Sequence, residues 1–434
     1  MKKKFVYIGL TADTIHHGHI NLIENAKRYG NVIVGLLTDK AVSDYKRLPL
    51  LSYEHRKKIL MNIKGVEKVV AQNEWDYSTN IRKFKPEYML HGNDWIIGSM
   101  SSVRKNVIKE LKKYGGKLIE IPYTKGVSST ALSIEQNKKF TTPELRLKNL
   151  RRLLEAKSFL RIIETHSPIS ALIAENSLIK KKNKIREFDG FWSSSLTDST
   201  SMGKPDIEVL DISERLSNIN KIFDVTSKPL IMDIDTGGKL EHLKLNIRSM
   251  ERLGISAVVM EDKTGLKKNS LNEKTSNQKQ ENIKNFCEKI EQINKVKLND
   301  EFMVIARIES FILGKGIKDA YLRASKYVEA GANGIMIHSK SKKTSEVFEF
   351  AKLFRKNNSS IPLVCVPSTY NSVKENQLIE KKFNIVIYAN HLFRAAYPAM
   401  QETAKSILTF ERSKEMDKKL ISISDILKLI PGTS

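Results

Sequence analysis

Eight short apolar runs recur along the C-terminal two-thirds of this 434-residue sequence, and helical patterns separate them. The runs are Ser170–Ile173, Phe188–Ser194, Leu230–Ile234, Ala257–Met260, Met303–Arg307, Gly334–His338, Leu363–Pro367 and Ile385–Ala389. Regular alternation of short buried strands with helices is typical of a (β/α)8 barrel with a parallel sheet. We therefore expect the larger part of the chain to form a TIM-type barrel.

The N-terminal part of the chain shows the same alternation on a smaller scale. Its expected strands are Phe5–Leu10, Val32–Leu37, Lys68–Ala71, Tyr88–His91 and Lys117–Ile121. This pattern predicts a parallel sheet with helices on both faces, as in a Rossmann-like domain. The sequence becomes polar between residues 135 and 145, before a long helical pattern. We therefore predict an α/β protein with two domains, residues 1–138 and 139–434.

The formal net charge of +25 raises the possibility that the chain binds nucleic acid. Its lysines, however, are scattered along the whole length, aromatic residues do not interleave with basic clusters, and no recognition motif is present. We therefore expect anionic small molecules as partners and no nucleic acid. A basic nucleic-acid-binding protein is the remote alternative.

Cysteine content and hydropathy indicate a cytoplasmic chain with no membrane partner. Cys287 and Cys365 lie far apart and form no C-x-x-C pair, so we expect neither a disulfide framework nor a cysteine zinc site. The first apolar run is short and Asp13 soon follows it, which favours a strand over a signal peptide. No stretch approaches the length of a membrane span.

Two histidines flank a glycine directly after the first expected strand, in the order His16-His17-Gly18-His19. Glycine lets the backbone approach a phosphate, a helix N-terminus attracts anions, and imidazoles can donate to phosphoryl oxygens as charge develops there. The pattern alone could arise by chance or bind zinc. Its position between a strand and a helix favours nucleotidyl transfer.

The first 135 residues resemble the cytidylyltransferase family, whose members join CTP to a phosphorylated alcohol and release pyrophosphate. The resemblance covers the histidine motif, Tyr53–Lys57, His91–Trp95 and Thr124–Thr130. It implies that CTP and a phosphonate or alcohol phosphate are substrates, and that His16 and His19 act catalytically. The nucleotide-binding residues that it implies are Thr11, Asp13, His16, His19, Arg56, Asp94, Ser128, Ser129 and Thr130.

Three positions depart from the cytidylyltransferase pattern, namely Leu10, Ala12 and Tyr123. Helix N-capping alone would also account for the hydroxyl residues Ser128–Thr130. A non-catalytic nucleotide-binding regulatory module is therefore the alternative for the N-terminal domain.

Polar residues end most of the expected barrel strands, on the face where barrel active sites lie. Asp233 and Asp235 are expected on one side of an extended backbone, and Glu261 follows the next strand. Three carboxylates suit a water-rich Mg²⁺ site. Arg307 offers a planar fork for phosphate or carboxylate, and His338 can donate or shuttle a proton. The alternative is a buried charge network that only stabilises the barrel.

Residues 145–410 resemble the phosphoenolpyruvate mutase and isocitrate lyase superfamily, through Trp192–Leu196, Ile231–Gly237 and Glu261–Ser270. The last segment is EDK followed after five residues by NS, a pattern that marks mutases. The lyases have a catalytic cysteine on the corresponding loop, and phosphonopyruvate hydrolases usually lack the asparagine. The polar stretch from Lys267 to Asn282 is expected to be a mobile lid or a solvated insertion.

This second resemblance implies interconversion of phosphoenolpyruvate and phosphonopyruvate in phosphonate biosynthesis, with Mg²⁺ bound by Asp233, Asp235 and Glu261. It implies the catalytic residues Asp206, Asn269, Arg307 and His338, and the substrate-binding residues Trp192, Ser194, Ser195, Leu196, Lys263 and Ser270. A phosphonopyruvate hydrolase or a carbon-carbon lyase is the alternative. Because relatives of the barrel form tetramers, we also expect a homo-oligomer, either a dimer or a tetramer.

Overall fold

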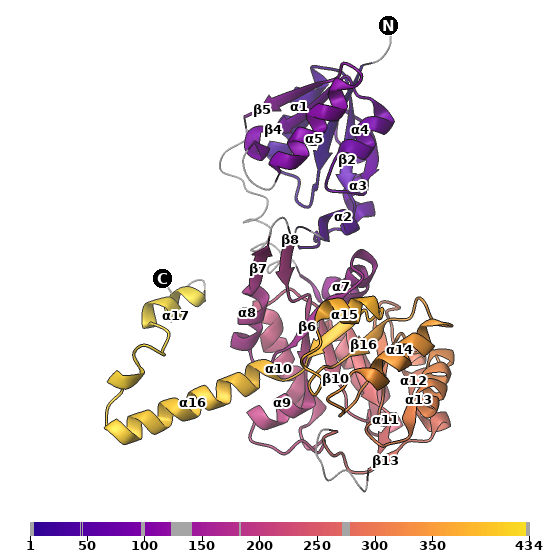
Figure 1. The fold of residues 1–434 in the computed structure, drawn as a ribbon, viewed down its shortest axis with the longest axis vertical. Coiled ribbons are helices and arrows are strands. Elements are labelled where there is room, and N and C mark those ends of the chain that lie inside the picture. Colours follow the sequence, from indigo (N-terminus) through magenta and orange to yellow (C-terminus); the bar gives the residue numbers. More distant parts are fainter. Residues whose placement is uncertain are drawn as a thin grey trace.

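The structure is a computed structural model that describes residues 4–43, 45, 47–96, 100–122, 141–181, 184–270 and 278–430. An N-terminal domain with an open sheet lies against one end of a closed barrel, and two C-terminal helices extend away from the barrel (Figure 1). Among the described residues, no helix has both the length and the apolar character needed to cross a membrane.

The N-terminal domain has a five-stranded parallel sheet in the order β3-β2-β1-β4-β5, which confirms the Rossmann-like prediction. Its strands are β1 (Phe5–Leu10), β2 (Asn31–Leu37), β3 (Val66–Gln72), β4 (Tyr88–Gly92) and β5 (Lys117–Ile121). Its helices are α1 (His17–Lys27), α2 (Asp39–Ser43), α3 (Tyr53–Met61), α4 (Ser78–Phe84), η1 (Asn93–Trp95) and α5 (Ser101–Lys112). The strand order reverses between β1 and β4, and such switch points are where open α/β sheets bind ligands.

The second domain is a closed eight-stranded barrel of parallel strands, as predicted. Its strands are β6 (Leu160–Glu164), β9 (Gly190–Ser193), β10 (Leu230–Asp233), β11 (Ala257–Glu261), β14 (Met303–Ile308), β15 (Gly334–Ile337), β16 (Leu363–Cys365) and β17 (Ile385–Tyr388). The helices around it are α7 (Pro143–Ala156), α8 (Pro168–Asn176), α9 (Ser195–Ser201), α10 (Ile212–Val225), α11 (Leu240–Leu253), α12 (Ile283–Val296), α13 (Gly316–Glu329), α14 (Ser345–Arg355) and α15 (Glu375–Glu380). Short antiparallel pairs join β7 (Leu178–Lys181) to β8 (Lys184–Glu187) and β12 (Lys263–Thr264) to β13 (Lys279–Gln280).

Alternation along each barrel strand builds two apolar layers. On β10, Ile231 joins the cluster inside the barrel, whereas Leu230 and Met232 join the cluster between strands and helices. Since neighbouring side chains point to opposite faces and both faces are buried, the strands appear in the sequence as continuous apolar runs.

The prediction for the first barrel strand was wrong. That strand is Leu160–Glu164, and the expected run Ser170–Ile173 lies within α8. The Ser167 hydroxyl accepts from the Ser170 amide at 3.3 Å, and Pro168 occupies the first turn, so this stretch carries the start signals of a helix. A four-residue apolar run cannot by itself distinguish a strand from part of a helix.

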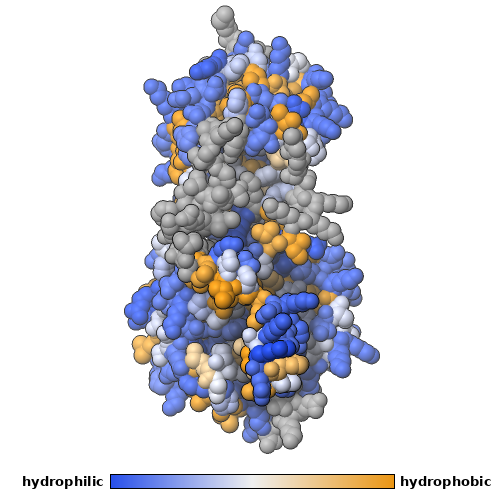
Figure 2. Space-filling model, turned by 90° about the vertical axis from the view of Figure 1, so that its left-hand side faces the viewer, coloured by the Kyte–Doolittle hydropathy of each residue, from blue (hydrophilic) through white to orange (hydrophobic). Residues whose placement is uncertain are grey.

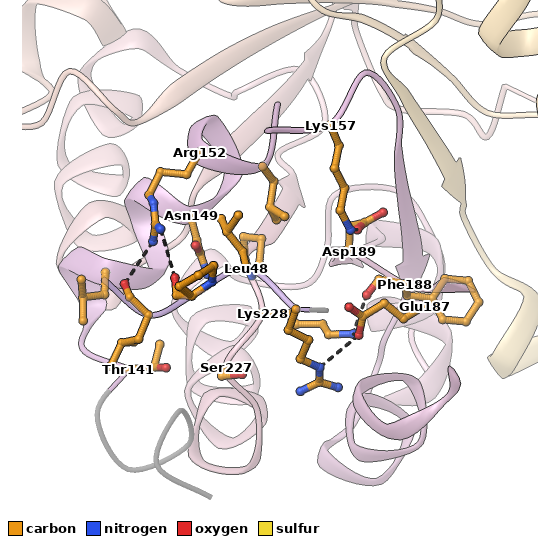
Figure 3. A pocket seen from close by; sticks show the side chains of 16 residues that line it. Leu48, Thr141, Asn149, Arg152, Lys157, Glu187, Phe188, Asp189, Ser227 and Lys228 are labelled. Carbon is orange, nitrogen blue, oxygen red and sulfur yellow. Dashed lines mark hydrogen bonds and ion pairs between the residues drawn. The ribbon is translucent and has the colours of Figure 1, made fainter. Parts of the chain in front are cut away.

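The N-terminal domain contacts the barrel at the end where the strands begin. Leu48 packs against the cluster inside the barrel, and Arg47 forms ion pairs with Glu175 (2.8 Å) and Glu187 (3.0 Å). Figure 3 shows the small pocket at this contact, where Lys228 lies beside Glu187 just before β10. The expected domain boundary at residues 138 and 139 lies outside the described residues and stays a prediction.

The C-terminal segment has α16 (His391–Phe410), η2 (Lys414–Met416) and α17 (Ile423–Leu429). Neither α16 nor α17 has a buried residue, although both carry large apolar side chains. Both helices project away from the barrel (Figure 1). On the side from which they project, hydrophobic patches interrupt the hydrophilic surface (Figure 2).

Candidate active sites

Carboxylates at the ends of neighbouring strands form the first candidate site. Asp233 ends β10, Glu261 ends β11, and both are almost fully buried together with Asp235. The expectation of an extended backbone through Asp235 was wrong, because Asp235 has a φ of 53°. That turn lets the Asp235 amide donate to the Asp233 carboxylate at 3.0 Å.

Burial disfavours the charged forms of the two strand-end carboxylates. Burial, and then the charge of Asp235, raise the pKa of Asp233. Burial raises the pKa of Glu261 to about 7, although Arg307 and Lys263 oppose this. Glu261 Oε1 is buried without a hydrogen bond, even though the Lys263 ammonium lies 3.1 Å away. Among the described residues, no three acidic, histidine or cysteine side chains already converge as metal ligands.

Arg307 and His338 meet over a carboxylate that sequence reasoning missed. Arg307 Nε donates to Glu309 Oε1 at 2.6 Å, and Arg307 Nη2 lies 3.0 Å from His338 Nδ1. Glu309 is fully buried, and although burial opposes ionisation, the charge of Arg307 holds its pKa well below the usual range. Glu309 follows Arg307 by two residues at a strand end, which is the signal that drew attention to Asp233 and Asp235.

The same contacts assign the tautomer of His338. Burial, and then the Arg307 charge, lower the pKa of His338, so the ring is neutral near pH 7. A guanidinium can only donate, so Nδ1 accepts from Arg307 and the proton resides on Nε2. We prefer this assignment to donation from Nδ1 to Glu309, whose contact is longer at 3.3 Å. His338 is therefore arranged to donate from Nε2.

The segment after β12, expected to be either a lid or a solvated insertion, reaches into the site. Asn269 Nδ2 donates to Asp206 Oδ2 at 3.0 Å, and Ser270 Oγ accepts from Arg307 at 2.8 Å. Lys263 is buried and donates to Ser270 Oγ at 2.9 Å and to the Lys268 carbonyl at 3.1 Å. These contacts fix the start of the segment beside the strand ends, and the structure describes the segment up to Ser270 and again from Gln278.

Lys267, to which the sequence assigned no role, lies at the centre of the site. Its ammonium contacts Asp206 at 2.6 Å and also bonds to Ser195 and Asp235. Burial alone would raise the pKa of Asp206, but Lys267 and hydrogen bonds from Asn269 and Ser195 outweigh it and lower the pKa. Asp206 is therefore ionised at neutral pH. Lys267 lies within the segment Glu261–Ser270, and this position was the available signal.

The loop after β9 forms the opposite wall of the site. Trp192 lies in the cluster inside the barrel, and its indole Nε1 is buried without a hydrogen-bond partner. Ser194 is the N-cap of α9 and makes no side-chain capping bond, while Ser195 and Leu196 begin that helix. Hydrogen bonds thus join Ser195, Asp206 and Asn269 around Lys267. A second network joins Lys263, Ser270, Arg307 and His338. Trp192, Ser194 and Leu196 are placed only by their positions in β9 and at the start of α9.

The second candidate site is the turn between β1 and α1. His16 is the N-cap of α1, its side chain accepts from the Gly18 amide at 3.1 Å, and its ring centroid lies 4.0 Å from that of His19. The first turn of α1 has no acidic residue, so the positive end of the helix is available to an anion. Burial, and then His17, lower the pKa of His16.

Of the other residues expected to bind nucleotide, only some lie in the turn. Thr11 and Asp13 lie in the turn, where the Asp13 carboxylate accepts from the Leu50 amide at 2.7 Å. Asp94 is exposed beside His91, whose ring stacks on Trp95. Arg56 is fully buried, and its guanidinium is used by backbone carbonyls and Asp39, so it supports the turn from behind. Ser128, Ser129 and Thr130 lie outside the described residues.

The barrel with acidic and basic side chains at its strand ends defines a TIM-barrel enzyme. The chain belongs to the phosphoenolpyruvate phosphomutase family, which matches residues 150–408. A cytidylyltransferase-like family matches residues 7–162, so the N-terminal domain is cytidylyltransferase-like.

Individual relatives are similar to one domain or the other. Phosphoenolpyruvate phosphomutase of Tetrahymena pyriformis is 32% identical over 67% of this chain and 93% of its own length. Glycerol-3-phosphate cytidylyltransferase of Bacillus spizizenii is 35% identical over 30% of this chain and 94% of its own length. A solved structure of phosphonopyruvate hydrolase in complex with oxalate and Mg²⁺ has a TM-score of 0.58 and 33% identity, covering 65% of this chain and 94% of that one.

Proposed function

We propose that the barrel interconverts phosphoenolpyruvate and phosphonopyruvate in phosphonate biosynthesis. In the forward direction the phosphorus–oxygen bond to the enol oxygen breaks and a phosphorus–carbon bond to C3 forms. The lid carries this proposal, because Asn269 reaches Asp206 inside the site and Ser270 joins the Arg307 network. A lid that excludes water protects the migrating phosphoryl group from hydrolysis.

The side chains of the barrel site fit the demands of phosphoryl transfer, in which positioning and electrostatics do most of the work. Arg307 would hold an anionic oxygen through Nη1, whose ion pair with Asp233 is long at 3.9 Å. His338 would donate from Nε2 to a substrate oxygen. The unpartnered Trp192 Nε1 adds a second neutral donor on the β9 side.

We propose that Asp233, Asp235 and Glu261 hold Mg²⁺. The three carboxylates lie at or just after two neighbouring strand ends, Glu261 Oε1 has no hydrogen bond, and an all-oxygen donor set suits magnesium. Bound there, Mg²⁺ would supply a Lewis acid for the substrate oxygens. Lys267 would have to leave Asp235, because its ammonium occupies the same carboxylate cluster.

A phosphonopyruvate hydrolase is the second candidate, because the hydrolase of solved structure is 33% identical to this chain. ³¹P NMR of the full chain with Mg²⁺ and phosphonopyruvate separates the two reactions. A mutase gives the signal of phosphoenolpyruvate, whereas a hydrolase gives inorganic phosphate and pyruvate. Inorganic phosphate as the sole product would refute the mutase proposal.

We further propose that the N-terminal domain transfers CMP from CTP to a phosphonate or an alcohol phosphate and releases pyrophosphate. The His16–His19 pair at the start of α1 supports this, as does the similarity to a glycerol-3-phosphate cytidylyltransferase. Pyrophosphate release with CTP and a panel that includes glycerol 3-phosphate and 2-hydroxyethylphosphonate tests it. CTP binding without turnover of any acceptor would favour the regulatory module instead.

We also propose that the chain forms a homo-oligomer in the cytoplasm. The large apolar side chains of α16 and α17 are exposed in the single chain, which supports burial against a second copy. Both cysteines are free thiols, as expected for a reducing compartment. Light scattering of the full chain and of a chain ending at residue 390, which lacks both helices, tests the oligomer, and equal masses would refute a role for the segment.

A further inference from the structure

The turn that carries the two histidines has a backbone that needs support. Ala12 is buried and has a φ of 53°, in the left-handed region that residues other than glycine seldom adopt. A conformation of this kind persists only when the surrounding structure holds it in place. The contacts of Thr11 and Asp13, on either side of Ala12, therefore decide the shape of the turn.

Two routes of hydrogen bonds hold these neighbours. On the first route, the buried Arg56 donates through Nη1 to the Thr11 carbonyl, and its Nη2 contacts Asp39 Oδ1 at 2.7 Å. On the second route, the Asp13 carboxylate accepts from the Leu50 amide at 2.7 Å. Neither route ends within the N-terminal sheet.

Both routes end at one guanidinium on the barrel. Arg152 Nη2 lies 3.0 Å from Asp39 Oδ2 and donates to the Pro49 carbonyl at 3.0 Å, and Nη1 donates to the Leu50 carbonyl at 3.1 Å. Arg152 belongs to α7, whose Leu150 and Leu153 are part of the cluster inside the barrel. Figure 3 shows Arg152 at the contact between the two domains.

We propose that Arg152 is a positioning residue for the nucleotide site of the other domain. Arg152 orients Asp39, which in turn orients Arg56 against the Thr11 carbonyl. Arg152 also holds the loop at Pro49 and Leu50, where the Leu50 amide binds Asp13. The barrel thereby presents His16 and His19 in the geometry that a nucleoside triphosphate requires. This inference rests on the proposed CTP-dependent function, and it makes the barrel a structural requirement for it.

The test uses the full chain and the substitution Arg152→Met. Without the guanidinium, amide hydrogen exchange in residues 11–16 is expected to become faster in the absence of nucleotide. The affinity for Mg²⁺–CTP, measured by calorimetry without an acceptor substrate, is expected to fall about 10- to 100-fold. The expected melting temperature and barrel activity remain those of the unchanged chain. Arg152→Lys, which keeps the charge near Asp39, is expected to restore part of the CTP affinity.

The matched control is Arg151→Met. Arg151 is the preceding residue of α7, but its guanidinium binds the carbonyls of Asp300 and Glu301 within the barrel, so exchange in the turn and CTP affinity should not change. Asp39→Asn removes the same ion pair from the other side and should reproduce the exchange result if Arg152→Met does not fold.

The outcomes separate this inference from the proposed function. Unchanged exchange in residues 11–16 for both Arg152→Met and Asp39→Asn overturns the positioning role, whether or not CTP binds. Absence of CTP binding by the unchanged chain refutes the nucleotide function, while faster exchange in the variants still supports positioning of the turn.

Discussion

The two candidate sites are built in opposite ways. In the barrel, Lys263, Glu309 and Glu261 are almost completely buried, and the charged groups are held by one another at the strand ends. In the N-terminal domain, the two histidines are partly exposed, and the shape of their turn depends on contacts that extend to the barrel. A buried ionic network is preorganised in a low dielectric, whereas an exposed turn needs external support.

The barrel site also lies at the end of the barrel that is opposite the N-terminal domain. Lys228 and Pro229, at the contact with the N-terminal domain, directly precede β10, and Asp233 ends that strand. The product of one site would therefore have to leave the protein before it could reach the other. Substitution of a residue in either site is expected to leave the other activity intact, apart from the positioning contact of Arg152.

The largest effect is expected for Arg307→Met, because it removes the cation that contacts Glu309, Glu261 and Asp233 together. We expect kcat/KM for conversion of phosphonopyruvate to fall about 1,000-fold or more, with CTP affinity unchanged. ³¹P NMR rates and calorimetry measure the two quantities. The control is Arg355→Met, whose guanidinium binds the carbonyls of Ile361 and Lys382 instead. A parallel loss of CTP binding would contradict the independence of the sites.

His16→Ala tests the candidate nucleotide site of the N-terminal domain. We expect CTP-dependent pyrophosphate release to fall about 100- to 1,000-fold, because the imidazole would no longer stabilise the transferring phosphoryl group, while barrel activity stays unchanged. A coupled pyrophosphate assay measures the effect. His17→Ala is the matched control, since His17 is the exposed neighbour on the same turn. Equal losses in both variants would show that the turn, rather than His16, had been damaged.

Asn269→Ala sharpens the distinction between mutase and hydrolase within the barrel. Loss of its hydrogen bond to Asp206 should loosen the lid, lower the formation of phosphoenolpyruvate about 10- to 100-fold and raise the share of inorganic phosphate. The ratio of the two ³¹P signals measures this change. Asn285→Ala, at an exposed position on α12, should keep the ratio of the unchanged chain. An unaltered ratio in Asn269→Ala would exclude the lid as the barrier to water.

The smallest effect is expected on the pH dependence of the free energy of unfolding. Burial and Arg307 lower the pKa of His338 from its ordinary 6.5, so below that pH the unfolded chain binds a proton that the folded chain does not. Its contribution to stability is therefore present above pH 6.5 and is lost as the pH falls toward the folded pKa, with a slope of at most about 1.4 kcal/mol per pH unit. In urea unfolding between pH 7 and pH 5, the free energy of unfolding should depend less on pH in His338→Gln than in the unsubstituted chain. A substitution of His242, which is exposed on α11, serves as the control. If the slope of the free energy of unfolding against pH is the same in His338→Gln as in the unsubstituted chain, the lowered pKa of His338 is contradicted.

Much of the fold could be predicted because short apolar runs and helix start signals are local features of the sequence. The apolar runs around β10, β11 and β14 are buried on both faces, and each is followed at once by a polar residue. The start of α1 at His17 followed from a glycine and histidines after a strand. The strand at Leu160 was missed, because a short apolar run has the same appearance in a helix and in a buried strand.

Part of the barrel site could also be predicted from the sequence. Asp233, Glu261 and Arg307 stand at strand ends, and closure of the barrel brings such residues to one face. Lys267 and Glu309 were missed, since a lysine in a polar loop and a glutamate after a strand are ordinary in themselves. Only their partners, which come from distant parts of the chain, distinguish them.

The sequence by itself therefore determined the two α/β folds and the residue types available for chemistry at the strand ends and at the start of α1. The tertiary structure alone decided which charges neighbour one another, as with Lys267 beside Asp206, and it alone joined Arg152 of one domain to the turn of the other. The physical reason is that apolar periodicity acts over a few residues, whereas the energy of a buried charge depends on every group that packing brings within a few ångströms.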